Sequence, residues 1–173
     1  MKTLDEITSM FAKEENLHIA DHFPYVVPST EKIVQAEFRS KKSSGYIAKK
    51  SKKMMESVIE FIELMWLYSD VKVYIFDNHT DSFFCKRKIM KHFSYNTFVD
   101  IKNVRQIEKL VKINCKNHMG IYFVFENFRQ NANVYMFLDD VVGAILFDDI
   151  MQKTEVEKIA SACHMFLRKK QIT

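Results

Sequence analysis

Glycine and proline are scarce in this chain of 173 residues, which contains three glycines and two prolines. With so few glycines, a glycine-rich loop of the kind that cradles phosphate groups is hard to place. The three cysteines, Cys85, Cys115 and Cys163, are scattered and form no CxxC pair. We therefore expect buried, reduced thiols in a cytoplasmic protein.

Long apolar runs are also absent. The longest, around Val58–Tyr68, is interrupted by Glu60 and Glu63, so it cannot span a membrane. The first ten residues, MKTLDEITSM, contain no apolar core of a signal peptide. Hydrophobic residues make up 47% and charged residues 28% of the chain, which is typical of a soluble globular protein. We expect one domain over residues 1–173, with no membrane partner.

The sequence does contain a dense stretch of aromatic and β-branched residues between Gly120 and Asp149. Three runs of strand length lie there: Ile121–Glu126, Asn133–Leu138 and Val142–Phe147. Polar, turn-capable residues separate them, and such short connections join neighbouring antiparallel strands. This stretch therefore predicts a three-strand antiparallel meander.

Helical periodicity and strand-like runs alternate through the rest of the chain. We predict helices over Leu4–Ala20, Ser51–Tyr68, Ser82–Phe93, about Val104–Asn117, and from the Thr154/Glu157 capping box to about Lys170. We predict further strands over Glu31–Phe38 (where a short helix is the alternative), Val71–Asp77 and, at a sheet edge, Tyr95–Val99. The predicted fold is α+β, with a mixed sheet that ends in the antiparallel meander and helices packed on it.

Several carboxylates stand at the ends of the strands of the predicted meander. They are Glu126, Asp139, Asp140, Asp148 and Asp149. Carboxylates at strand ends can hold Mg²⁺, but successive hairpin turns lie at opposite ends of a sheet, and aspartate is also a common turn residue. We therefore interpret these acids as partner-binding residues or turn residues, and we assign no metal site, cofactor or catalytic residue.

The most basic stretch is Arg39–Lys53, which contains Lys49, Lys50, Lys52 and Lys53 and no acid. A solvated loop followed by the start of a helix explains it without any ligand. The alternative is a nucleic-acid contact, made together with Lys86–Lys91. The net charge of +4 is too small to decide between the two.

Patterns typical of enzymes are incomplete. His18 and His22 are spaced i, i+4, but the glutamate that follows the first histidine of a zincin motif is missing. Asp77 closes a predicted strand, but the Glu-x-Lys of restriction-type nucleases does not follow on the next strand. A metal-dependent nuclease or phosphodiesterase remains an alternative without a complete motif.

The C-terminal half resembles a family of small uncharacterised bacterial proteins encoded near polymorphic toxins. In that family an aromatic strand precedes a strand that ends in Tyr-Asp-Asp-Arg-Gly, followed by an apolar strand and a helix. Here Ile121–Phe125, Tyr135–Leu138 with Asp139-Asp140, and Gly143–Phe147 stand in that order. Leu138 replaces the tyrosine, and Val141-Val142 replaces Arg-Gly. The resemblance implies an immunity-like binding role, as in contact-dependent inhibition.

We therefore expect a non-enzymatic immunity protein that occludes the active site of a toxin domain. Such a toxin, if it acts on nucleic acid, has a basic cleft in which Asp139, Asp140, Asp148, Asp149 and Glu126 stand in for phosphates. An exposed Trp66, the only tryptophan, would also indicate an interface.

Overall fold

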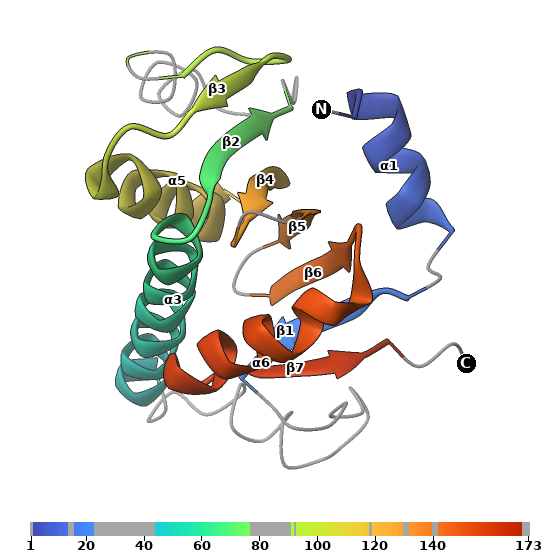
Figure 1. Ribbon diagram of the computed structural model, residues 1–173. Coiled ribbons are helices and arrows are strands. Elements are labelled where there is room, and N and C mark those ends of the chain that lie inside the picture. The colour runs from blue at the N-terminus through green and yellow to red at the C-terminus, as the bar shows by residue number, and fades with distance from the viewer. Residues whose placement is uncertain are drawn as a thin grey trace.

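A single antiparallel sheet of seven strands, in the order β3-β2-β4-β5-β6-β1-β7, runs through the described part of the chain (Figure 1). This computed structural model describes residues 2–13, 16–22, 44–76, 91, 93–117, 119–129, 132–139 and 142–170, with 44–51, 116 and 117 described by backbone alone. The strands are β1 (His18–Asp21), β2 (Asp70–Ile75), β3 (Phe98–Asp100), β4 (Ile121–Phe128), β5 (Ala132–Asp139), β6 (Val142–Phe147) and β7 (Phe166–Lys169).

The predicted meander is confirmed as β4, β5 and β6, the centre of the sheet. Met136 in β5 pairs with Phe123 in β4 and with Ile145 in β6. Both faces of these strands are apolar, because helices cover the sheet on both sides. The expectation of a mixed sheet was wrong, because every described strand pair is antiparallel.

Helices lie on both faces of the sheet, as Figure 1 shows. They are α1 (Leu4–Ala12), α3 (Ser44–Trp66), α5 (Val104–Asn117) and α6 (Lys153–Ala162), preceded by the short 3-10 helix η2 (Ile150–Gln152). The larger core lies between the sheet and α3, α5 and α6, and it includes Phe61, Leu110 and Val156. Helix α1 covers the other face, where Ile7 packs with Tyr135. The sheet is therefore the middle layer of the fold, with an apolar core on each side.

Both terminal helices are shorter than predicted. Helix α1 ends at Ala12 with Lys13 as its C-cap, and Asn16, just before β1, has a positive φ of 60°. Helix α6 ends at Ala162, and His164 adopts the left-handed conformation (φ 57°) that often follows a helix C-terminus. Beyond these residues the chain forms β1 and β7, which pair with each other. The predicted Thr154 capping box was also wrong, because α6 begins at Lys153 after η2 and has no side-chain cap.

The remaining elements follow the sequence pattern. Helix α3 contains the predicted Met and Ile stripe but begins earlier, at Ser44. The edge strand predicted at Tyr95–Val99 is β3, shifted towards Asp100. The strand predicted at Glu31–Phe38 lies outside the described residues, as does nearly all of the helix predicted at Ser82–Phe93.

Candidate protein-binding surface

The acids predicted to bind a partner are divided between the two ends of the sheet. Asp139 pairs with Val142 at the β5–β6 turn. At the other end, the Asp148 backbone N–H donates to the carbonyl of Asn133, 3.1 Å away, at the start of β5. Glu126 and Asp149 also lie at this second end, while Asp140 lies outside the described residues. The five predicted acids therefore do not form one cluster.

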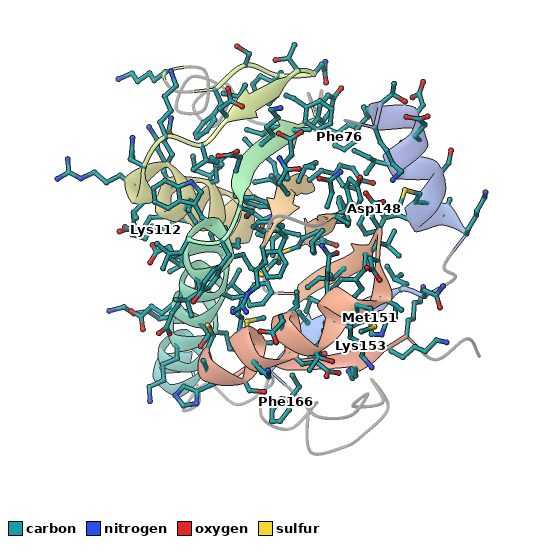
Figure 2. The ribbon with its side chains drawn as sticks, viewed as in Figure 1. Phe76, Lys112, Asp148, Met151, Lys153 and Phe166 are labelled. Atoms are coloured by element: carbon teal, nitrogen blue, oxygen red, sulfur yellow. The ribbon has the colours of Figure 1, made fainter. Side chains whose placement is uncertain are left out.

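Asp148 anchors the N-terminal segment to the sheet. Its carboxylate accepts hydrogen bonds from Tyr135 Oη at 3.0 Å and from Asn133 Nδ2 at 3.2 Å, and it forms an ion pair with Lys2. Figure 2 shows it on the side of the sheet that faces α1. Burial alone would lower the pKa of Lys2, but hydrogen bonds to Asp148 and Tyr135 raise it overall. Burial also raises the pKa of Tyr135. The Tyr135 hydroxyl is therefore neutral, and it lies beside the Asp148 carboxylate, which is paired with Lys2.

Glu126 and Asp149 also have partners within the chain. Glu126 forms an ion pair with Lys72 at 2.6 Å, and this hydrogen bond raises the pKa of Lys72. The Asp149 carboxylate accepts a hydrogen bond of 2.9 Å from the Met151 backbone N–H, which caps η2. These acids hold local structure, and binding a partner through them would have to add to or compete with these contacts.

The basic stretch continues into α3. Lys52 and Lys53 are exposed there, and Lys52 lies 3.7 Å from Glu56 one turn on. Lys49 and Lys50 also belong to α3 but are described by backbone alone. The next turns carry Glu60 and Glu63 beside Glu108 of α5, and burial together with these like charges raises the pKa of Glu63. Nucleic-acid binding through α3 stays a prediction.

His18 and His22, spaced i, i+4, do not share a helix, because His18 is in β1 and His22 follows it. His18 is buried and its Nδ1 lies 2.8 Å from the Asn16 carbonyl. Burial lowers the pKa of both histidines. Within the described ranges, no three His, Cys, Asp or Glu side chains are grouped closely enough to hold a metal ion.

Large apolar side chains are exposed at few described positions, and four of them form two pairs of chain neighbours. Leu67 is 68% and Met151 78% exposed, and their chain neighbours Tyr68 and Ile150 are exposed as well. Leu67 and Tyr68 form the turn between α3 and β2, while Ile150 and Met151 belong to η2. Exposed apolar groups that belong to one patch are typical of interaction sites.

Arg129 connects these two segments. Its guanidinium lies 4.6 Å from the Tyr68 ring centre, and its backbone N–H donates to the Tyr68 carbonyl at 2.9 Å. The same guanidinium forms an ion pair with Glu155 at 3.0 Å, and Arg129 lines a small hollow of about 70 Å³ together with Met151. We call Tyr68, Arg129 and Met151, together with the exposed chain neighbours Leu67 and Ile150, the end surface.

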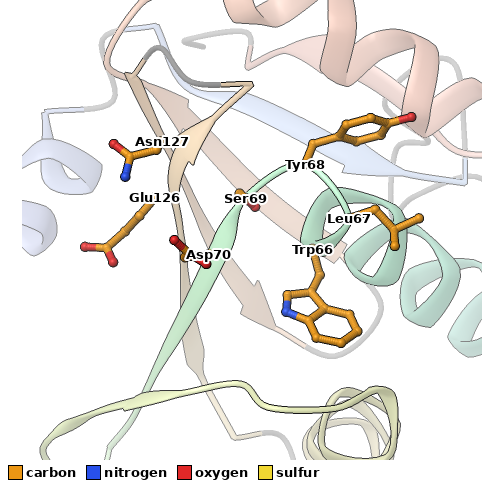
Figure 3. A pocket seen from close by; sticks show the side chains of 7 residues that line it. All are labelled: Trp66, Leu67, Tyr68, Ser69, Asp70, Glu126 and Asn127. Atoms are coloured by element: carbon orange, nitrogen blue, oxygen red, sulfur yellow. The ribbon is translucent and has the colours of Figure 1, made fainter.

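A shallow cavity of about 520 Å³ adjoins the end surface. Trp66, which is partly buried against the core, and the neighbouring Leu67 and Tyr68 form its apolar side. Asp70, Glu126 and Asn127 form its polar side (Figure 3). The figure shows the two groups on opposite sides of the start of β2, so the cavity is a saddle across the end of the sheet.

The backbone of the β4–β5 turn is strained where it meets this surface. φ is 50° at Asn127 and 51° at Arg129. Asparagine tolerates this left-handed region, whereas for arginine it costs about 1 kcal/mol or more. The conformation directs the Arg129 N–H at Tyr68, and strain of this kind concentrates at functional sites.

Sequence reasoning did not identify the end surface, because exposure depends on what covers a residue. One signal was available: Leu67 and Tyr68 extend the apolar stripe of α3 beyond the end of the helix. Ile150 and Met151 give a second such signal, because they are apolar residues between the acidic pair Asp148-Asp149 and the helix start predicted at Thr154.

Comparison with known proteins places no constraint on these assignments, because no family model, curated protein or solved structure matches the chain. In the parts of the chain that the structure describes, no helix is both long and apolar enough to cross a membrane.

Proposed function

We propose that this chain is a non-enzymatic protein-binding protein that docks its partner on the end surface. The observation that carries the proposal is that Arg129 stacks on exposed Tyr68 and lines a small hollow with exposed Met151, while their chain neighbours Leu67 and Ile150 are exposed as well. Tyrosine, methionine and arginine are enriched in protein interfaces, and tyrosine and arginine recur among the residues that dominate binding energy. A stacked, ion-paired arginine is already held in place, which reduces the entropy lost on binding.

The resemblance of the C-terminal half supports a more specific form of the proposal. In this form the chain is an immunity protein, and its partner is the toxin domain encoded beside it. The end surface would cover the toxin's active site, so that neutralisation needs no reaction by this chain. Asp149 and Glu126 lie next to the end surface, and they are the predicted acids best placed to meet a basic cleft there.

Calorimetric titration of the purified chain with the product of the adjacent gene tests this proposal. We expect a complex at micromolar concentration or tighter, and a loss of affinity on the order of tenfold or more in Leu67→Ser/Met151→Ser, since both anchors are removed. Val142→Ser is the matched control, because Val142 is exposed at the opposite end of the sheet. Absence of any complex, or equal losses in the two variants, would contradict the proposal.

A further inference from the structure

The saddle beside the end surface has walls of different chemistry. Its apolar wall consists of the Trp66, Leu67 and Tyr68 side chains. Its other wall carries the carboxylates of Asp70 and Glu126, and the described lining includes no cation. A volume of about 520 Å³ is large enough to take two side chains of a partner but is too open to enclose a small molecule.

The polar wall has an excess of negative charge. Asp70 on β2 is the cross-strand partner of Glu126 on β4, and Asp100 on β3 is the cross-strand partner of Lys72. All three carboxylates act on Lys72 and raise its pKa, with the Glu126 hydrogen bond the largest effect. Lys72 is thus the one ammonium group among these three carboxylates, although the whole chain has a net charge of +4. The side chain of Glu126 is only 16% exposed, whereas Asp70 is exposed and accessible to a partner.

We infer that the saddle receives a partner-protein segment in which a lysine or arginine adjoins a large apolar side chain. The cation lies against Asp70, with Glu126 behind it, and the apolar side chain packs on Trp66 and Leu67. A long basic side chain suits this place, because its methylene stem crosses apolar surface while its charged group reaches the carboxylates. An acidic segment or a phosphate backbone is repelled at the same position. This inference rests on the proposed function and names the chemistry of the partner.

Panning a phage-displayed library of random linear peptides against the immobilised full chain tests the inference. We expect the enriched peptides to share a lysine or arginine beside an aromatic or large aliphatic residue. Asp70→Asn should weaken the best synthetic peptide roughly three- to tenfold at low salt, with a smaller effect at high salt. Asp139→Asn is the matched control, because Asp139 is an exposed acid at the opposite end of the sheet.

The outcomes separate this inference from the proposal on which it rests. Peptides that lack a cation, or that bind Asp70→Asn as tightly as the wild type, overturn the inference. If such peptides still lose affinity for Leu67→Ser/Met151→Ser, the end surface remains a protein-binding surface. Failure to enrich any peptide that is sensitive to Leu67→Ser/Met151→Ser counts against both.

Discussion

Asn114 is a fully buried polar side chain in the helical layer. Its amide donates to the carbonyl of Leu138 at 3.2 Å and also to the carbonyl of Met119. It thus ties α5 to the segment before β4 and to the end of β5. A buried amide is tolerated here because its donors are used.

Replacing Asn114 with alanine should lower the free energy of unfolding by about 1–3 kcal/mol, because two buried carbonyls lose a donor. Urea denaturation followed by circular dichroism measures this. Lys112→Ala, on an exposed position of the same helix where Lys112 pairs with Glu108 at 2.6 Å, should cost less than about 0.5 kcal/mol. Equal costs for the two variants would show that the Asn114 bonds do not stabilise the fold.

His18 makes stability depend on pH near neutrality. Burial lowers its pKa, the Asn16 carbonyl and Glu157 oppose this, and Lys153 and Lys169 reinforce it. The unfolded chain, with a histidine pKa of about 6.5, therefore takes up a proton that the native state resists. Stability conferred by the neutral imidazole is present above about pH 6.5 and is lost as the pH falls below that value.

Replacing His18 with asparagine, which keeps a donor for Asn16, should reduce the drop in urea midpoint between pH 7.5 and pH 5.5. Burial lowers the pKa of His22 as well, so the drop should shrink rather than vanish. Hydrogen bonds lower the pKa values of Glu6 and Glu155. These two carboxylates therefore take up protons only below the pH range of this measurement. An unchanged pH dependence would contradict the assignment to His18.

At the scale of elements, pairing between distant segments determines which secondary structure forms near the two ends of the chain. Local sequence at 163–170 is compatible with a helix, and the predicted helix ran on to Lys170. Instead β7 pairs with β1, and Arg168 Nη2 donates to Asp21 Oδ2 at 2.7 Å. Both side chains are largely buried. An interaction between such distant positions cannot be read from periodicity, which reports only neighbours along the chain.

Replacing Asp21 with alanine should speed amide hydrogen exchange in β1 and β7 and cost about 1.5–3 kcal/mol, because it leaves the buried Arg168 guanidinium without this partner. Exchange measured by mass spectrometry resolves the two strands from the rest. Asp21→Ala/Arg168→Met should recover part of the loss, since the buried charge is removed as well. Lys169→Ala, on the same strand but exposed, is the control and should leave exchange unchanged.

The meander could be predicted because each strand is encoded locally. Its runs are dense in aromatic and β-branched residues, and polar turns separate them, so no distant partner is needed to identify them. Helices α3 and α5 were predicted from their apolar stripes for the same reason. The all-antiparallel order, in contrast, depends on where β1 and β7 join the sheet.

The candidate site could be predicted only in part. The sequence indicated that Glu126 and Asp149 are turn-end acids, and the structure places both beside the end surface. It could not indicate that Lys72 and Lys2 come from other elements to pair with Glu126 and Asp148. It also could not show which of the many apolar residues would remain uncovered after folding.

At the scale of the whole molecule, the end surface lies where helix, turn and sheet end meet, away from the core. Leu67→Ser/Met151→Ser should therefore leave the free energy of unfolding within about 0.5 kcal/mol of the wild type. Phe61→Ala, at a fully buried position, should cost about 3–5 kcal/mol. Urea denaturation of both proteins makes the comparison. A large loss in the surface variant would mean that these side chains serve folding.

Photo-crosslinking in host cells tests the central claim most directly, because it captures a partner whose identity is unknown. Benzoylphenylalanine is placed at Leu67 or Met151, and at Val142 or Phe166 as exposed controls elsewhere on the sheet. The end surface, if it docks a protein, should give one discrete heavier species from both Leu67 and Met151 and none from either control. No crosslink at Leu67 and Met151, or the same crosslinks at all four positions, would contradict the account.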